Sequence, residues 1–168
     1  MVYRAEYNRV AVYDYACRWW NDRNLNFPNF SDDCTGFVSQ CLLAGGIPMH
    51  YTGNVESGWW FRRTQAYESW SYSWSVAHSL RWYLSSRDAV DFAHVMDEPY
   101  DLMIGDLIFY DWNGDGVWQH SAVVVGHDPE GEPLVAAHSV NSFNRNWRYE
   151  TSQSWSVIPN MYFFIFLI

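Results

Sequence analysis

Residues 33–46 read DCTGFVSQCLLAGG, and this stretch has the pattern of a short helix with one apolar face. Its apolar side chains recur at positions 34, 37, 38, 41 and 42, the spacing that brings residues onto one side of a helix. Asp32 or Asp33 can cap the free amides at the helix start, and Gly45-Gly46 favours its end, because glycine readily adopts a positive φ. We therefore expect a helix with Cys34 in its first turn and the Cys34 thiol directed toward the core.

This position of Cys34 favours a role as nucleophile. A thiol reacts as its thiolate, and the unpaired amides and dipole at a helix start stabilise negative charge. A nearby imidazole could take the proton and later return it to a leaving amine. Cys17 and Cys41 lack this setting, and we interpret both as packed, inert side chains.

Helices are predicted before residue 100 and strands after it. The periodicity predicts helices over about 3–21 and 77–87. Beyond Gly105, short β-branched segments predict strands at 106–111, 119–126, 133–138 and 162–168. Helices followed by strands are typical of an α+β fold, in which the antiparallel sheet packs on the early helices. We expect a single domain over residues 1–168, with a helical half at about 1–100 and a sheet half at about 101–168.

Two histidines flank the predicted turn at residues 127–132. Counting back from this turn places His120 within one residue of His138, where cross-strand neighbours have Cβ atoms about 5 Å apart. The alternation of side chains, counted in the same way, puts both imidazoles on the face that meets the Cys34 helix. We therefore predict His120 as the base and His138 as the group that orients it. The backbone N–H of Cys34, beside Asp33 in the cleft, would help to bind an oxyanion.

The composition argues against several other classes of function. The formal net charge of -9 disfavours nucleic acid, because phosphate binding needs an excess of Lys and Arg. Residues 1–8 lack the pattern of a signal peptide, and the apolar segment 162–168 is too short to cross a bilayer. We expect no membrane segment, no cofactor and a monomer. A secreted or cell-envelope location stays open, since a trimmed secreted domain would look the same.

One acidic segment has the beginning of a calcium-binding loop. Asp111, Asn113 and Asp115 match the first ligands of an EF-hand, but its twelfth position is Ala122 where a bidentate Glu is required. We therefore expect a tight turn here and no metal. Zinc held by Cys34 and the two histidines is disfavoured too, because the paired-ligand spacing of zinc sites is absent.

Tryptophan is concentrated in residues 59–82, the Trp-rich segment. Such wide, flat side chains serve either as core filler or as platforms on which sugars and peptides stack. The competing hypothesis for the whole chain is a non-catalytic module on the same fold that binds glycan or peptide through this segment. The five tryptophans concerned are Trp59, Trp60, Trp70, Trp74 and Trp82.

Three segments together resemble those of a known group of hydrolases. DCTGFVSQ at 33–40, GDLIFY at 105–110 and HSAVVVG at 120–126 resemble the NlpC-type and CHAP-type bacterial cell-wall amidases and peptidases. With residues 7–20 and 41–46, the chain is more similar still to a bacterial amidase domain family of the papain-like superfamily.

This resemblance implies a papain-like fold and cleavage of an amide in a peptide or peptidoglycan-like substrate. It places Cys34, His120 and His138 at the catalytic positions. The third position varies among such enzymes, and Asn141 is a rival for it. Replacing Cys34 by Ala separates the two hypotheses for the chain. An enzyme would lose turnover, whereas a binding module would be unaffected.

Overall fold

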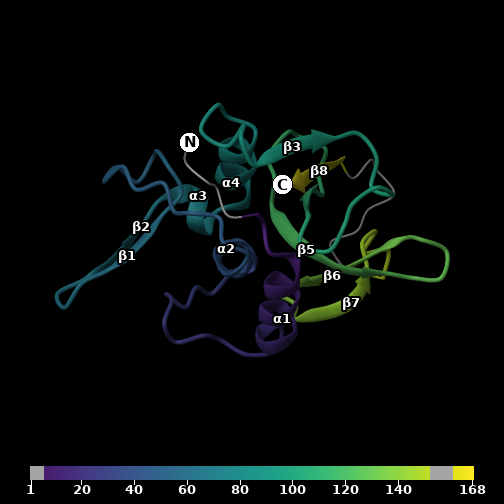
Figure 1. Cartoon of the computed structure of the whole chain (residues 1–168), viewed down its shortest axis with the longest axis horizontal. Coiled ribbons are helices and arrows are strands. Elements are labelled where there is room, and N and C mark those ends of the chain that lie inside the picture. Colours follow the sequence, from purple (N-terminus) through teal and green to yellow (C-terminus); the bar gives the residue numbers. More distant parts are fainter. Residues whose placement is uncertain (1–5, 152–160) are drawn as a thin grey trace.

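The computed structural model describes residues 6–151 and 161–168 as an α+β protein with antiparallel sheets (Figure 1). The α+β class predicted from the sequence is thereby confirmed. Its helices are α1 (Arg9–Trp19), α2 (Cys34–Ala44), α3 (Tyr72–Ser75) and α4 (Ala77–Leu84). Its strands are β1 (Phe61–Arg63), β2 (Glu68–Trp70), β3 (Ala93–Met96), β4 (Leu107–Asp111), β5 (His120–His127), β6 (Pro133–Ala137), β7 (Ser142–Asn146) and β8 (Met161–Leu167).

Six strands form the main sheet, in the order β3-β8-β4-β5-β6-β7, and every neighbouring pair is antiparallel. The last strand, β8, pairs with β3 on one side and with β4 on the other, and Figure 1 shows it beside β3. The remaining strands, β1 and β2, form a separate hairpin that extends away from the sheet. The predicted strands near 106–111, 119–126, 133–138 and 162–168 are confirmed, with small shifts at their ends.

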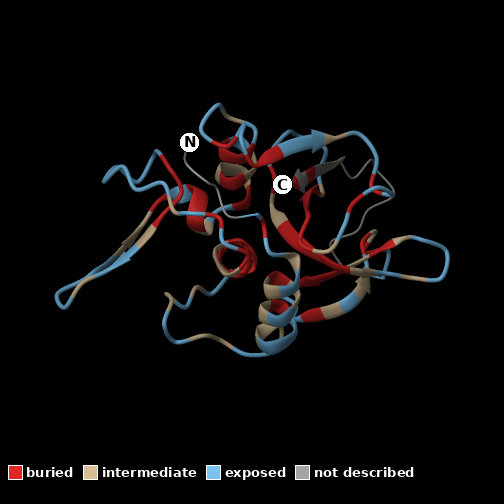
Figure 2. Ribbon diagram, in the orientation of Figure 1, coloured by how far each residue is buried: buried red, intermediate tan, exposed pale blue. Residues whose placement is uncertain are grey.

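Helix α2 is the central helix of the fold. All of its residues from Cys34 to Leu42 are buried, and it packs on α1 and on β5 (Figure 2). It ends at Gly45, and Gly46 follows with a φ of 93°, a conformation that suits glycine, so the predicted helix end is confirmed. The predicted start is confirmed, since Asp33 is the N-cap residue, but its side chain makes no hydrogen bond to the helix amides, so the predicted side-chain capping is wrong.

The first helix is shorter than predicted. It begins after Asn8, whose side-chain oxygen accepts a hydrogen bond from the Ala11 amide at 3.0 Å. Asparagine in this position satisfies one of the free amides at a helix start. The beginning of the predicted helix, at residues 3–5, lies outside the described residues. Within the ranges that are described, no helix is both long and apolar enough to span a membrane.

The two faces of the main sheet contribute to different clusters of buried side chains. On the face toward α1, α2 and α4, the strands contribute Leu107, Phe109, Val123, Val125 and Ala136 to the larger cluster. The opposite face forms a smaller cluster, in which strand residues pack against Leu102, Trp147 and Tyr149. Its strand residues are Ile108, Tyr110, Ala122, Val124, Val135 and Ala137. Which face a side chain occupies therefore decides which surroundings it has.

Candidate active site

Cys34 is the first residue of α2, and its side chain faces the beginning of β5. Its sulfur lies 3.6 Å from the hydroxyl oxygen of Thr35, which in turn is 3.1 Å from the hydroxyl oxygen of Ser121. The residue is 4 % exposed, so the thiol lies just below the surface. The helix start and β5 together fix its position.

Burial raises the pKa of the Cys34 thiol, and nearby groups modify that effect. Hydrogen bonds from Thr35, and from the backbone N–H and hydroxyl of Ser121, lower the pKa, while the negative charge of Asp32 raises it. The Ser121 N–H belongs to the peptide bond that joins Ser121 to His120. The sulfur therefore lies beside the residue that carries the predicted base.

His120 is surrounded by aromatic rings, which we name the aromatic enclosure: Tyr110, Trp112 and Tyr149. The centroid of its imidazole lies 5.3 Å from the centroids of both tyrosine rings and 6.1 Å from that of the tryptophan, with which it is stacked. Its Nε2 lies 3.1 Å from the Tyr149 hydroxyl oxygen. The tyrosine hydroxyl thus contacts one ring nitrogen and fixes the orientation of the imidazole.

The enclosure also sets the charge of His120. Burial lowers the pKa of this imidazole to about 4, with Asp32 raising it and Arg145 lowering it to smaller extents. The ring is therefore neutral at pH 7 and has a nitrogen lone pair available. A neutral imidazole is the form in which histidine acts as a base.

His138 has different surroundings. It is 2 % exposed, and its ring stacks on Phe37 of α2 with the centroids 4.1 Å apart. Its Nδ1 lies 2.9 Å from a carboxylate oxygen, Oδ2, of Asp33, and its Nε2 lies 2.7 Å from the backbone oxygen of Trp19. A carbonyl oxygen only accepts hydrogen bonds, so Nε2 carries a proton. Both ring nitrogens are thus engaged away from His120.

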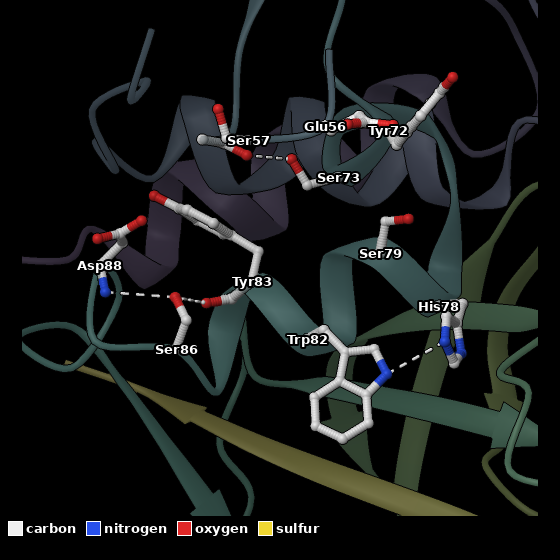
Figure 3. Close-up of a pocket in the computed structure, with 11 residues that line it drawn as sticks. Glu56, Ser57, Tyr72, Ser73, His78, Ser79, Trp82, Tyr83, Ser86 and Asp88 are labelled. Carbon is white, nitrogen blue, oxygen red and sulfur yellow. Dashed lines mark hydrogen bonds between the residues drawn. The ribbon is translucent and has the colours of Figure 1, made fainter. Parts of the chain in front are cut away.

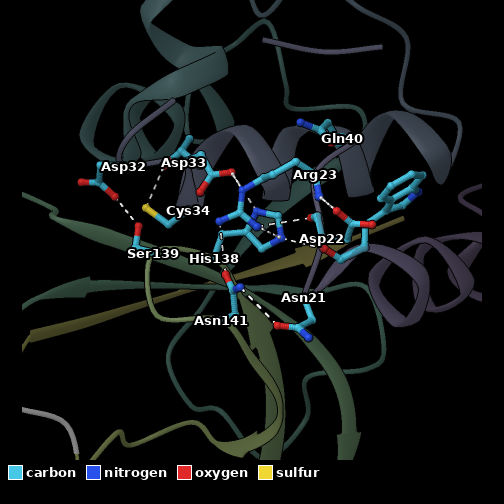
Figure 4. A network of polar contacts seen from close by, with 12 residues as sticks. Asn21, Asp22, Arg23, Asp32, Asp33, Cys34, Gln40, His138, Ser139 and Asn141 are labelled. Carbon is cyan, nitrogen blue, oxygen red and sulfur yellow. Dashed lines mark hydrogen bonds and ion pairs between the residues drawn. The ribbon is translucent and has the colours of Figure 1, made fainter. Parts of the chain in front are cut away.

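Asp33 is the centre of a polar group that we name the Asp33 cluster: Arg23, Asp33, His138 and Asn141 (Figure 4). The Nε of Arg23 lies 2.8 Å from the same Oδ2 of Asp33 that faces His138. Arg23 also donates to the Asn141 side-chain oxygen at 3.2 Å. The cluster joins the loop after α1, the start of α2 and the end of β6. Asn141, the rival third residue, thus contacts Arg23.

The other carboxylate oxygen of Asp33, Oδ1, is buried and has no hydrogen-bond partner among the described residues. Unsatisfied buried oxygens are uncommon in proteins, because leaving water without a new partner costs about 1–3 kcal/mol. This acceptor belongs to the residue that precedes Cys34.

The expectation that both histidines share one face of the sheet is wrong. His120 lies with the smaller cluster, whereas His138 stacks on α2, which belongs to the larger one. The register pairs Val123 with Ala136, and continued along the strands it places His138 opposite Ser121. Adjacent residues of a strand point to opposite faces, so a slip of one residue separates the two rings. An irregularity between Val124 and Gly126 produces this register.

Three residues near the thiol and the imidazoles were not predicted: Ser121, Tyr149 and Arg23. Ser121 lies within the quoted segment at 120–126, but its role depends on the register. Tyr149 has a φ of 56°, a left-handed conformation that is uncommon for a tyrosine. Nothing in the sequence around it or around Arg23 points to the site.

The predicted turn at residues 111–116 is confirmed. Asp111 is fully buried, and its carboxylate accepts hydrogen bonds from the backbone amides of residues 113–116. Its oxygens thus hold the loop backbone. In the part of the chain that the structure describes, no group of three or more His, Cys, Asp and Glu side chains is placed to hold a metal ion.

The other two cysteines differ from each other. Cys41 is fully buried in the larger cluster, and burial raises the pKa of its thiol, as expected for a packed side chain. Cys17 is exposed, so its prediction as a packed residue is wrong. An exposed thiol on α1 is a useful comparison for the reactivity of Cys34.

These features define an α+β protein with a cysteine at a helix start next to a histidine-bearing strand. The family described as "Putative amidase domain" matches residues 6–163, and the chain belongs to this family. Its relatives include two proteins of Bacillus subtilis (strain 168). "Uncharacterized protein YhbB" is 45 % identical over 151 residues, which is 90 % of this chain and 47 % of that protein.

The second relative, "Uncharacterized protein YjcM", is 28 % identical over 155 residues, which is 88 % of this chain and 34 % of that protein. The chain therefore spans about half or less of the length of the curated relatives it matches. No solved structure matches it significantly. The family description suggests an amidohydrolase.

Proposed function

We propose that this chain is a cysteine-dependent amidohydrolase with a papain-like fold, in which Cys34 is the nucleophile and His120 the base. One observation supports this most strongly: the Cys34 sulfur, at the start of α2, faces the peptide bond between His120 and Ser121. Membership of an amidase family supports the same reaction class.

The reaction begins with proton transfer. Because burial raises the pKa of the Cys34 thiol and lowers that of His120, both are neutral at rest at pH 7. The thiol proton moves to Nδ1 of His120 as the sulfur attacks the substrate carbonyl, and the thiolate and imidazolium stabilise each other. The imidazolium then donates this proton to the leaving amine, and water hydrolyses the acyl-enzyme.

The surrounding residues have positioning roles in this proposal. The Tyr149 hydroxyl holds Nε2 of His120, which leaves Nδ1 as the nitrogen assigned to take the thiol proton. His138 acts through Asp33, because their contact joins the end of β6 to the residue before the nucleophile. Asn141 supports the same cluster through Arg23.

Two groups beside the nucleophile are suited to bind an amide substrate. The backbone N–H of Cys34, at the helix start, would stabilise the oxyanion of the tetrahedral intermediate. The buried, unpaired Oδ1 of Asp33 would accept a hydrogen bond from a substrate N–H group once a local shift exposes it. Amides of peptides and of peptidoglycan-like stem peptides offer both a carbonyl and such N–H groups, and we propose them as the substrate class.

The experiment is a screen of peptidoglycan fragments and short peptides for released amine. Wild type is compared with Cys34→Ala and with Cys17→Ser, which changes an exposed thiol away from the site. We expect release by wild type and Cys17→Ser and none by Cys34→Ala. Equal release by Cys34→Ala would contradict the proposal.

Thiol labelling at pH 7 provides a test that needs no substrate. A limiting alkylating reagent followed by peptide mapping should modify Cys34 in wild type, and His120→Asn should slow that modification while leaving the labelling of Cys17 unchanged. If Cys34 is inert in the folded protein, or labels equally fast in both, the proposed pairing is wrong.

A further inference from the structure

A second candidate site lies on the side of α4, outside the groups described above. Figure 3 shows residues that line a pocket between α4, the start of α3 and residues 56–58. The volume of this pocket is about 480 Å³. Its lining includes Glu56, Tyr72, Ser79, Trp82 and Asp88. Neither Cys34 nor the two histidines of the candidate active site contribute to it. A volume of this size is in the range of small-molecule sites in proteins.

The lining has an unusual composition. All of its residues are aromatic, hydroxyl-bearing or acidic, apart from one His and one Gly, and none is an aliphatic residue, Lys or Arg. Two carboxylates, from Glu56 and Asp88, lie on exposed residues of the rim. Such a lining offers hydrogen bonds and flat ring faces, and its two carboxylates disfavour a ligand that places negative charge beside them.

Trp82 is the main apolar surface of this pocket. It is 55 % exposed, whereas Trp59, Trp60 and Trp74 of the Trp-rich segment are at most 2 % exposed and belong to the packed interior. The segment is therefore mostly core filler, and Trp82 is its exposed exception. Leaving a ring of this size in water forgoes the free energy that its burial would contribute.

The indole of Trp82 is also held in place. Its Nε1 donates to Nε2 of His78 at 3.1 Å, and the Arg81 guanidinium carbon lies 4.0 Å from the ring centroid. The ring is thus fixed before any ligand arrives, which reduces the entropy lost on binding. Tyr72, also of the pocket lining, is 50 % exposed.

We propose that this pocket binds an uncharged saccharide, with a pyranose ring stacked on Trp82 and its hydroxyls bound by Glu56, Asp88 and the serine side chains. A sugar ring has an apolar C–H face and a polar hydroxyl edge, which match the indole and the carboxylates respectively. An aliphatic peptide side chain would find no aliphatic partner in this lining. An anionic sugar would meet the two carboxylates.

This inference does not rest on the proposed hydrolase function, because none of its residues belongs to the candidate active site. Cys34→Ala protein therefore serves as the binding partner, so that turnover cannot confuse the measurement. The probe is a neutral hexamer of β-1,4-linked N-acetylglucosamine, titrated in a calorimeter.

We expect saturable binding by Cys34→Ala and about tenfold or greater weakening when Trp82→Ala is added, as for a central aromatic contact. Tyr67→Ala is the matched control, since Tyr67 is 58 % exposed on the β1–β2 hairpin turn and away from the pocket. Its affinity should equal that of the parent. Circular dichroism of each variant verifies the fold.

The carboxylates give an independent readout. Glu56→Gln and Asp88→Asn together should weaken saccharide binding several-fold, because a carboxylate accepts stronger hydrogen bonds than an amide. Glu98→Gln, at another exposed position, should not. The proposal is overturned if the hexamer does not bind, if Trp82→Ala binds as tightly as its parent, or if a lysine-rich peptide binds through Trp82 in place of the saccharide.

Discussion

The two histidines of the main sheet lie on neighbouring segments of the chain and in opposite chemical settings. His120 is enclosed by aromatic rings, with one nitrogen on a tyrosine hydroxyl, whereas His138 is held between a carboxylate and a backbone carbonyl. The first setting disfavours the charged imidazolium, and the second engages both ring nitrogens in polar contacts. A single residue of register decides which face of the sheet each ring occupies, and so separates the proposed base from the proposed structural support.

The largest expected effect that separates the two rings is on catalysis. His120→Asn removes the proton acceptor for Cys34, so we expect amide hydrolysis to fall about 10²- to 10⁴-fold. The measurement is kcat/KM on the best substrate from the screen. His94→Asn, at an exposed position of β3, is the control and should be without effect. A loss below about threefold in His120→Asn would remove His120 from the role of base.

The second effect is on stability, and here His138 should dominate. His138→Ala leaves the buried Asp33 carboxylate without one of its partners and removes the ring that stacks on Phe37. We expect the free energy of unfolding to fall by about 3 kcal/mol, measured by urea denaturation. His94→Ala should change it by less than about 0.5 kcal/mol. Equal stability of His138→Ala and wild type would mean that the Asp33 cluster is not a structural support.

A third effect concerns pH. The folded-state pKa of His120 is about 4, below its ordinary value of 6.5, so the unfolded chain binds more protons between these two values. The contribution of His120 to the free energy of unfolding should therefore be fully present above about pH 6.5. It should be lost as the pH falls toward 4, by up to about 3 kcal/mol. Urea denaturation at pH 7, 6, 5 and 4 measures the slope. His120→Asn should have a shallower slope than wild type, and an unchanged slope would contradict the burial of His120 as a neutral ring.

The smallest effect tests the enclosure itself. Tyr149→Phe keeps the ring and removes the hydroxyl that contacts Nε2 of His120, so we expect kcat to fall about five- to tenfold with KM unchanged. The pH profile of Cys34 alkylation should shift, which a purely structural role would not produce. Tyr67→Phe, on the exposed hairpin, is the control. A fall in stability without a shift of this profile would make Tyr149 a packing residue only.

The sequence predicts this fold well where a pattern is local. The stripe from Cys34 to Leu42 and the glycines after it define α2 almost to the residue, because helix periodicity and termination depend on neighbours in the chain. The short hairpin β1–β2 and the edge strands β3 and β7 were not predicted. Their sequences alternate weakly, and their pairing is set by distant partners.

The candidate site is harder to predict, because its geometry depends on register. His120 and Cys34 are recognisable as types of residue in suitable places, but the contact of His120 with Tyr149 joins residues 29 apart. Whether the His120 and His138 side chains lie on the same face of the sheet depends on one irregularity in β5. A period-2 count cannot detect such an irregularity, and every side chain beyond it changes face.

The placement of β8 has a consequence for how the chain acquires its structure during synthesis. Among the strands that the structure describes, β3 pairs with β8 alone, and the Arg9 guanidinium and Asp106 carboxylate bind the backbone of Leu167. Until residues 161–167 have left the ribosome, the nascent chain cannot complete its main sheet. The edges of β3 and β4 that pair with β8 remain unpaired until then. The slow step of folding is therefore expected to be the insertion of β8 between two strands that were synthesised well before it.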